Sequence, residues 1–260
     1  MGVFRFKKFE VINERSAMKV NTDGVLLGAA MTIKAGDRCL LDIGTGTGTI
    51  ALMAAQRVYR SFAVAQDDSV CAQDDGICCQ DIRIDAIDID EPSASEAAVN
   101  FQNSPWSRSL HAHNLSLDQF AQSLPEDRAY DIIFSNPPYF EDSLTAPDER
   151  KSTARHTSEG LSYRDIFEFA EQRLSEQGRV SLVLPADQEL ALCRYARMCG
   201  LHLFRILRIR TVPRKAPGRI VAEFSRARTD SPAEEMLTIQ NEGQYTQEYL
   251  SLMHDFYLFA

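Results

Sequence analysis

The sequence lacks the features that mark membrane and secreted proteins. In its 260 residues, no stretch comes close to the ~20 uninterrupted apolar residues that a membrane helix needs. The N-terminus, MGVFRFKKFEVINERSAMKV, has no apolar core of the kind found in a secretory signal peptide. We therefore expect a cytoplasmic protein with reduced thiols, long enough for one large α/β domain or for such a domain with a small appendage.

The cysteines lack the spacing of metal-binding modules. The chain has six cysteines and no C-x-x-C pair, although Cys71, Cys78 and Cys79 lie close together in the sequence. Structural zinc sites use cysteines about two to four residues apart, together with histidines or further cysteines. We therefore expect no metal, and we interpret these thiols as small packing residues or exposed loop residues.

Positive charge is scarce overall but concentrated in one segment. The formal net charge of −9 argues, taken alone, against a nucleic-acid partner. Residues 194–228, however, contain ten Lys or Arg and a single acid, Glu223. The ten are Arg194, Arg197, Arg205, Arg208, Arg210, Arg214, Lys215, Arg219, Arg226 and Arg228. A local basic stripe can bind phosphates whatever the total charge is. The alternative is a solvated basic face.

Segments typical of strands and helices alternate between residues 38 and 185. Strands are predicted over 38–44, 83–90, 109–117, 130–136 and 179–185, and helices over 49–58, 91–104 and 163–178. The last helix is expected to end at Gly178 as its C-terminal cap. The alternation predicts a doubly wound, mostly parallel sheet. Three later segments, 201–213, 218–228 and 236–240, are predicted to be antiparallel strands that complete the sheet edge.

One stretch interrupts this alternation. Residues 59–83 contain the tetrapeptide Ala-Gln-Asp-Asp twice, at 65–68 and 72–75. The repeated acids and the scarcity of core-forming residues predict an exposed insertion at about 61–81.

A glycine-rich loop follows the first predicted strand. LLDIGTGTGTIAL places Gly44, Gly46 and Gly48 between a strand and a helix, where glycines allow a tight turn and close approach of a ligand to the main chain. The pattern also fits the loose dinucleotide motif G-x-G-x-x-[GA], read from Gly46. Asp42 would point a carboxylate into the loop, which suits a ligand with an ammonium or sulfonium group better than a pyrophosphate.

A second acid is expected at the end of the next strand, where it can accept hydrogen bonds from ribose hydroxyls. Asp88 is the candidate, although it lies 46 residues after Asp42 instead of the usual ~20. Removing the predicted insertion would shorten the interval to 25 residues. We therefore expect Asp88 to be a ribose ligand rather than a solvated strand end.

Three motifs together resemble the class I S-adenosylmethionine-dependent methyltransferases. They are D-x-G-x-G-x-G from Asp42 to Gly48, the acid Asp88, and N-P-P-Y at 136–139. Within that class, N-P-P-Y is similar to the motif of enzymes that methylate amino groups of adenine, guanine or glutamine. Residues 9–29 and 147–166 further resemble the bacterial tRNA(Val) N6-adenine methyltransferases, which act on adenine 37, the base 3′ to the anticodon.

This resemblance covers most of residues 4–225 and implies a fold, a cofactor and a partner. The implied fold is α/β and class I (Rossmann-like), with a doubly wound, mostly parallel seven-stranded sheet and an antiparallel C-terminal edge. We expect a single methyltransferase domain over 1–260, with an N-terminal lid over 1–35 and the exposed insertion. The implied cofactor is S-adenosylmethionine and the implied substrate is tRNA, bound by a monomer.

The resemblance also assigns roles to further residues. Thr22 and Asp23 are expected near the methionine end of the cofactor, and Ser116 stands where many relatives carry an aspartate that contacts the cofactor adenine. Phosphates beside the target base are expected to be held by residues after the N-P-P-Y turn and in the basic segment. These are Arg150, Lys151, Arg155, His156, Arg214, Lys215 and Arg219.

The N-P-P-Y turn suits chemistry at an exocyclic amino group, whose lone pair is delocalised into the ring. The Asn136 side-chain oxygen and the Pro137 carbonyl can each accept one N–H, which would aim the lone pair at a methyl donor. Pro137 and Pro138 stiffen the turn and have no N–H of their own. Tyr139 or Phe140 can stack on a flipped-out base, a contact worth about 1–3 kcal/mol. The alternative is that the turn is merely rigid.

Other functions are compatible with parts of this pattern. A glutamine-amide N5-methyltransferase is disfavoured by the basic segment and by the lack of a helical substrate domain before the glycine loop. Methylation of rRNA or DNA is an alternative, although no separate target-recognition domain is apparent after residue 185. A non-catalytic cofactor-binding module would be expected to have lost Asn136 or the glycines, and a nicotinamide oxidoreductase has no need for N-P-P-Y.

Overall fold

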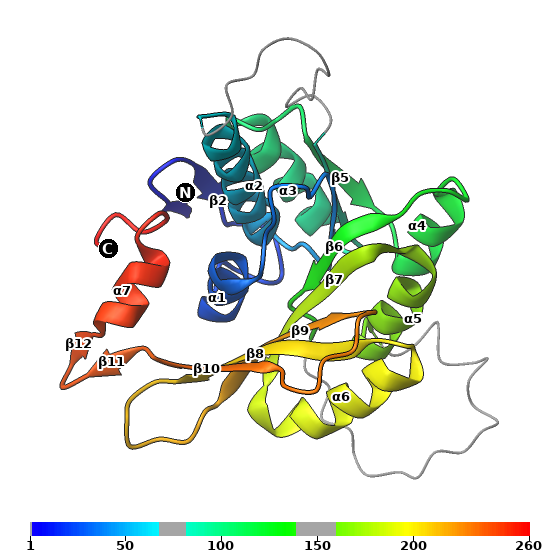
Figure 1. Ribbon diagram of the computed structural model, residues 1–260. Coiled ribbons are helices and arrows are strands. Elements are labelled where there is room, and N and C mark those ends of the chain that lie inside the picture. The colour runs from blue at the N-terminus through cyan, green and yellow to red at the C-terminus, as the bar shows by residue number, and fades with distance from the viewer. Residues whose placement is uncertain (1, 68–81, 139–159) are drawn as a thin grey trace.

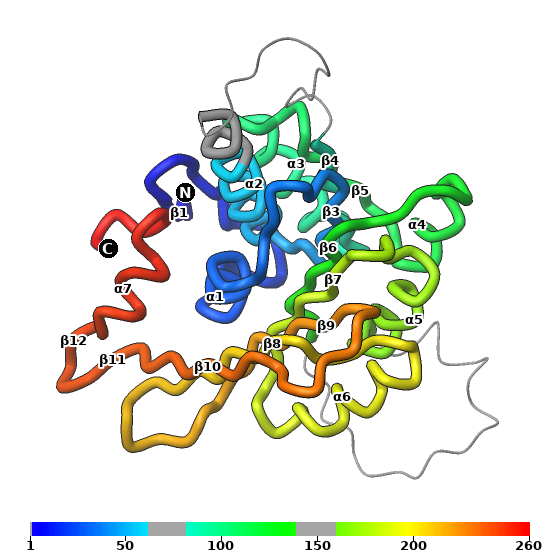
Figure 2. The backbone as a smooth tube through the Cα atoms, viewed as in Figure 1, coloured from blue at the N-terminus to red at the C-terminus, as the bar shows by residue number. Residues whose placement is uncertain are grey.

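The computed structural model describes residues 2–67, 82–138 and 160–260 (Figures 1 and 2). Side chains are described for all of these except 62–67. Among the described residues, no helix is long and apolar enough to cross a membrane. The two termini lie side by side (Figure 2), and the Lys7 Nζ donates a hydrogen bond to the carbonyl of Ala260.

An eight-stranded sheet forms the centre of the fold, in the order β10-β8-β9-β7-β6-β3-β4-β5 (Figure 1). Strands β3 to β7 run parallel, and β9 is antiparallel to both of its neighbours, β7 and β8. Their bounds are β3 Cys39–Ile43, β4 Arg83–Asp88, β5 Leu110–Asn114, β6 Tyr130–Ser135, β7 Leu174–Pro185, β8 His202–Arg210, β9 Arg219–Ser225 and β10 Ala233–Thr238. The predicted doubly wound, mostly parallel sheet is confirmed.

Two details of the predicted sheet edge are wrong. The described sheet has eight strands instead of seven, and the segment around 236–240 pairs parallel to β8 as strand β10, not antiparallel. Ion pairs join the two strands: the Arg205 guanidinium contacts Glu235 at 2.7 Å, and that of Arg208 contacts Glu234 at 2.9 Å. The acids of β10 therefore match the arginines of β8.

The helices cover both faces of the sheet (Figure 1). On one face α1, α2, α3 and α7 form a hydrophobic core, and on the other α4, α5 and α6 form a second one. Adjacent strand residues alternate between the two, with Leu40 in the first and Leu41 in the second, as a pleated strand requires. The helices are α1 Thr22–Ala30, α2 Thr49–Asp67, α3 Glu91–Gln102, α4 Leu117–Ser123, α5 Tyr163–Arg173, α6 Glu189–Met198 and α7 Gln247–Met253.

Short elements complete the chain. The antiparallel pair β1 (Val3–Arg5) and β2 (Glu10–Ile12) precedes α1, and the pair β11 (Gln240–Asn241) and β12 (Gln244–Tyr245) precedes α7. A 3-10 turn, Ala186–Gln188, follows β7. Helix α2 continues to Asp67, so the first residues of the predicted insertion at 61–81 are helical, and 68–81 lie outside the described residues.

Helix α5 ends earlier than predicted. It stops at Arg173, and β7 begins at Leu174, so Gly178 is a strand residue and not a helix cap. The register between β6 and β7 shifts near this point. A Cβ at Gly178 would lie 2.8 Å from the carbonyl oxygen of Tyr130. This glycine is therefore needed for close approach of two strands, which a sequence pattern cannot distinguish from a cap.

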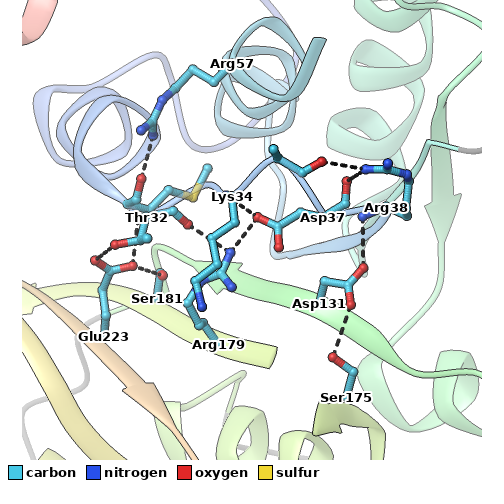
Figure 3. A network of polar contacts seen from close by, with 12 residues as sticks. Thr32, Lys34, Asp37, Arg38, Arg57, Asp131, Ser175, Arg179, Ser181 and Glu223 are labelled. Carbon is cyan, nitrogen blue, oxygen red and sulfur yellow. Dashed lines mark hydrogen bonds and ion pairs between the residues drawn. The ribbon is translucent and has the colours of Figure 1, made fainter. Parts of the chain in front are cut away.

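A buried polar network fastens the segment after α1 to the sheet (Figure 3). Glu223 on β9 is fully buried, and its carboxylate accepts hydrogen bonds from the amide and the hydroxyl of Thr32, both at 2.8 Å. It also accepts from the Ser181 hydroxyl at 2.8 Å and from the Arg205 guanidinium at 2.7 Å. Four donors therefore compensate for the desolvation of this carboxylate.

A second buried ion pair lies beside the first (Figure 3). Arg179 on β7 contacts the Asp37 carboxylate at 2.5 Å, and both side chains are almost fully buried. Asp37 also accepts a hydrogen bond from the Lys34 amide at 2.6 Å. The chain between α1 and β3 is thus held to the sheet at both Thr32 and Asp37.

Replacing Glu223 with alanine should destabilise the protein strongly, because Arg205 and three other donors would lose a buried acceptor. Breaking a buried ion pair in this way typically costs about 3–5 kcal/mol. The control Glu234→Ala removes an exposed partner of Arg208 and should cost about 1 kcal/mol or less. Urea unfolding of both variants measures the difference, and equal losses would contradict the role given to Glu223.

Candidate active site

The glycine-rich loop between β3 and α2 has a backbone that only glycine adopts easily. Gly44, Gly46 and Gly48 have φ angles of +72°, +56° and +81°. At Gly48 a Cβ would also lie 2.5 Å from the Phe101 ring on α3, so this glycine serves helix packing. At Gly46 a Cβ would meet the carbonyl of Met18 at 3.4 Å. The loop is therefore shaped on one side by α3 and on the other by the N-terminal segment.

Asp42, at the end of β3, is fully buried directly beneath this loop. The Thr45 hydroxyl donates to its Oδ2 at 2.7 Å, whereas its Oδ1 lacks a hydrogen-bond partner of good geometry among the described residues. Burial raises the pKa of this carboxyl to about 7, against the opposing effects of the Thr45 hydroxyl and the Ala51 amide. An unsatisfied buried polar atom is uncommon in proteins, which marks this position as a candidate for function.

Asp88 connects the end of β4 to the glycine loop. Its Oδ2 accepts a hydrogen bond from the Gly46 amide at 2.8 Å, and its Oδ1 accepts one from the Asp90 amide at 2.9 Å. Burial raises the pKa of this carboxyl, and the two amides oppose that shift. Each oxygen keeps a further lone pair that can accept from a ligand hydroxyl.

Asn136 lies at the carboxyl end of β6 and lines the same pocket as the glycine loop. The pocket is lined by Met18, Lys19, Val20, Asn21, Gly24, Gly44, Thr45, Gly46, Thr47, Thr49, Ile50 and Asn136. The Asn136 side chain is 6% exposed, and its Nδ2 lies 3.4 Å from Asn21 Oδ1 and 3.6 Å from Met18 Sδ. Pro137 is buried and Pro138 is exposed. A polar amide thus faces the space beside the loop.

The N-terminal segment covers this pocket. Asn21 caps α1 by accepting a hydrogen bond from the Gly24 amide at 2.8 Å, and both residues line the pocket. Thr22 and Asp23, predicted to lie near the cofactor, come between them in the first turn of α1 and do not line it. The Asp23 carboxylate instead accepts a hydrogen bond from the Arg219 Nε at 2.8 Å.

That ion pair changes the interpretation of the basic segment. Arg219, at the start of β9, is predicted to bind RNA, but it already pairs with the Asp23 carboxylate. Arg205 and Arg208 are also engaged in ion pairs, and Arg226 donates to the carbonyls of α5 residues and of Leu174. Much of the stripe is therefore internal structure rather than a free basic face.

Two basic residues at the edge of the site differ from these paired arginines. Arg214 and Lys215 are exposed on the loop between β8 and β9, and neither contacts a partner within the described part of the chain. Because β8 and β3 point the same way across the sheet, this loop lies at the same edge as the carboxyl end of β3. Arg194, on α6, is exposed and likewise has no partner in the described ranges.

Ser116 has a structural function, and its predicted contact with the cofactor stays a prediction. Its hydroxyl accepts a hydrogen bond from the Gln119 amide at 3.2 Å, and the Gln119 side chain accepts from the Ser116 amide at 3.0 Å. This reciprocal capping box begins α4. The hydroxyl proton of Ser116 can still be donated to a ligand.

The sequence predictions missed one exposed apolar residue at this edge. Ile89 follows Asp88 directly and is 77% exposed. The Asn114 side chain donates to the carbonyls of Asp88 and Ile89 at 3.0 and 3.1 Å, which fixes the backbone at this point. The sequence did contain a signal for this residue, since Ile89 is an apolar residue between two acids, Asp88 and Asp90, at a strand end. Its side chain offers a surface on which a flat ring can lie.

Part of the predicted substrate site is not described. Tyr139, Phe140, Arg150, Lys151, Arg155 and His156 lie outside the described residues. The predictions for these residues therefore stay predictions.

Comparison with known proteins identifies the class. A family model described as RMKL-like, methyltransferase domain, matches residues 27–199. The chain superposes with a TM-score of 0.59 on a predicted O-methyltransferase from Agrobacterium tumefaciens, covering 90% of this chain and 96% of that one at 16% identity. Together the glycine loop, the sheet order and these matches define a methyltransferase.

Full-length relatives narrow the class to one family. The tRNA1(Val) (adenine(37)-N6)-methyltransferase of Parabacteroides distasonis is 38% identical over 98% of this chain and 97% of its own length. The protein of the same name from Flavobacterium psychrophilum is 35% identical over 98% of this chain and 99% of its own length. The chain belongs to the family of tRNA1(Val) (adenine(37)-N6)-methyltransferases.

The buried carboxyl of Asp42 predicts a pH dependence of stability. Its pKa rises from 3.8 to about 7 on folding, so between these values the folded protein binds the proton more tightly than the unfolded chain does. The free energy of unfolding should therefore decrease as pH rises through this window. Asp42→Asn cannot ionise, and its stability should fall less between about pH 4 and pH 7.

Urea unfolding at several pH values tests this prediction. Asp127→Asn, at an exposed position, serves as the control and should keep the parent's pH dependence. If Asp42→Asn lost as much stability as the parent over this range, the titration would have to come from other groups.

Proposed function

We propose that this protein transfers a methyl group from S-adenosylmethionine to the N6 amino group of adenine 37 in tRNA1(Val). The observation that carries the proposal is the buried amide of Asn136 in the same pocket as the glycine loop. The full-length relatives of that name support the choice of substrate.

The residues of the glycine loop and of the neighbouring strand ends fit the cofactor. The bound cofactor supplies an electrophilic methyl group on a sulfonium. Asp88, which accepts from the Gly46 amide, has lone pairs left for the ribose hydroxyls, and Asp42, which accepts from the Thr45 hydroxyl, brings negative charge to the loop when ionised. Gly44 and Gly46 keep the main chain open to a ligand, and Ile89 offers an apolar surface for the adenine ring. Ser116 can donate its hydroxyl proton to that ring.

Thr22 and Asp23 contribute to cofactor binding without lining the pocket, by holding the first turn of α1 in place. They lie in the first turn of α1, between the pocket residues Asn21 and Gly24. The pair of Asp23 with Arg219 anchors this turn to β9. Arg219 therefore contributes to the cofactor site by holding α1, in addition to any contact with phosphate.

Asn136 and Pro137 position the target amino group. The Asn136 side-chain oxygen and the Pro137 carbonyl each accept one N–H of the adenine amino group, so its lone pair points at the incoming methyl. Pro137 and Pro138 limit the flexibility of the turn. No strong base is needed, because the amino proton becomes acidic only after the new N–C bond forms. Tyr139 or Phe140 stacks on the base.

The exposed basic side chains at the sheet edge bind the RNA phosphates. Arg214 and Lys215 have no partner in the described ranges, so they can pair with phosphates at no cost to internal ion pairs. Arg150, Lys151, Arg155 and His156 complete this contact in the proposal. A protein substrate methylated on a glutamine amide has no phosphates for these basic side chains to bind. Mass spectrometry of tRNA from a deletion strain distinguishes the two, since only the RNA substrate predicts loss of N6-methyladenosine.

Asn136→Ala should reduce single-turnover methylation by about 100-fold, because a misplaced nucleophile typically costs that much. Affinity for the cofactor and for tRNA should stay near the parent's values, since the side chain aligns the reacting group. Asn241→Ala, at an exposed position on β11, is the control. Parental turnover in Asn136→Ala would reduce the N-P-P-Y turn to a structural role.

Neutralising Arg214 and Lys215 together should weaken tRNA binding and make it less dependent on salt. Each lost phosphate contact lowers the slope of log K against log salt by about 0.7–0.9, so the pair should lower it by roughly 1.4–1.8. Arg194→Ala, which removes another exposed basic residue, on α6, should leave the slope unchanged. A parental slope in the double variant would move the RNA path away from this loop.

A further inference from the structure

Glu96, on α3, binds the N-terminal segment through its main chain. The carboxylate is 4% exposed and accepts hydrogen bonds from three consecutive backbone amides. The distances are 3.0 Å from Glu14, 2.5 Å from Arg15 and 3.5 Å from Ser16. A buried carboxylate surrounded by amides from another segment is a strong, specific anchor, since hydrogen bonds to a charged acceptor are stronger than neutral ones.

Two neighbours on the same face of α3 extend this anchor. The Asn100 Oδ1 accepts from the Ile12 amide at 2.8 Å, and its Nδ2 donates to the carbonyls of Ile12 and Thr47 at 3.0 and 2.9 Å. The Ser93 hydroxyl donates to that of Ser16 at 2.9 Å. Helix α3 therefore links the N-terminal segment to the glycine loop, to which Thr47 belongs.

The anchored residues lead directly into the segment that covers the pocket, residues 18–21, here called the cover. The Ser16 hydroxyl donates to the Met18 carbonyl at 2.9 Å, and the Lys19 ammonium donates to the Glu14 carbonyl at 2.6 Å. Met18 and Lys19 both line the pocket. Glu96 does not line it, so any effect of Glu96 on a ligand there has to pass through residues 14–19.

We propose that Glu96 is a positioning residue for cofactor binding, acting through residues 14–19 on the cover of the pocket. This inference rests on the proposed function. The carboxylate is required because three N–H donors converge on it, and a neutral amide would turn an NH₂ group toward some of them. Losing the anchor would let the cover detach from the glycine loop, and the cofactor would lose its contacts on that side.

The test compares Glu96→Gln with Glu91→Gln, an exposed acid on the same helix that contacts only Ser95 within the described residues. Calorimetry with S-adenosylhomocysteine should show about tenfold or greater loss of affinity in Glu96→Gln and none in the control. Trypsin should cleave faster after Arg15 and Lys19 in Glu96→Gln, and saturating S-adenosylhomocysteine should slow this cleavage. Unchanged emission of Trp106, the single tryptophan, which packs on Phe9, would show that the variant is folded.

The outcomes separate the inference from the proposed function. Parental affinity together with parental cleavage in Glu96→Gln overturns the role of Glu96 alone. A parent protein that does not bind S-adenosylhomocysteine overturns the proposed function and this inference with it.

Hydrogen exchange on the parent protein keeps the inference testable if Glu96→Gln does not fold. The amides of Glu14, Arg15 and Ser16 should exchange slowly and become slower still with saturating S-adenosylhomocysteine, because a ligand that contacts the cover favours its closed position. Exchange of these three amides that does not respond to the ligand overturns the inference.

Discussion

The common direction of β3, β4 and β6 is the constraint on which the site depends. In this register Asp42 lies opposite Phe134, and Ile43 lies opposite Ile87, so all three strands end at one edge of the sheet. The glycine loop, Asp88 and Asn136 follow those three strand ends. Gly44 and Asn136, 92 positions apart in the chain, thereby line a single pocket. An antiparallel strand in the middle of this group would send one of them to the opposite edge.

The site also carries a cost in stability. Asp42 is buried with one oxygen unsatisfied, and its raised pKa reflects the loss of hydration of that carboxylate. Other buried carboxylates of the fold do not carry this cost, because they are well satisfied. Glu223 accepts four hydrogen bonds from donors within reach, and Glu96 accepts from three amides. Departures from complete satisfaction are expected at the functional sites of enzymes.

The basic segment shows why charge counted along a sequence is a weak guide to a binding surface. Glu223, the single acid among ten bases, is the centre of a buried network that includes Arg205. Acids outside the segment, such as Asp23 and Glu234, pair with other basic residues of the segment. Only the fold brings these charges together, so a one-dimensional count overestimates the free positive charge. The exposed loop with Arg214 and Lys215 is what remains at the site edge.

The sequence by itself determined the doubly wound sheet and the composition of the loop, because strand and helix periodicities and glycine spacing are local properties. It also predicted site roles for Asp42, Asp88 and Asn136, since each lies near the end of a predicted strand, and these roles stay predictions. The tertiary structure decided the rest, through contacts between distant segments. The pairing of Asp23 with Arg219, the anchoring of residues 14–16 by Glu96 and the strand position of Gly178 all depend on neighbours far apart in the chain. No local pattern contains that information, because it arises only when the chain is packed.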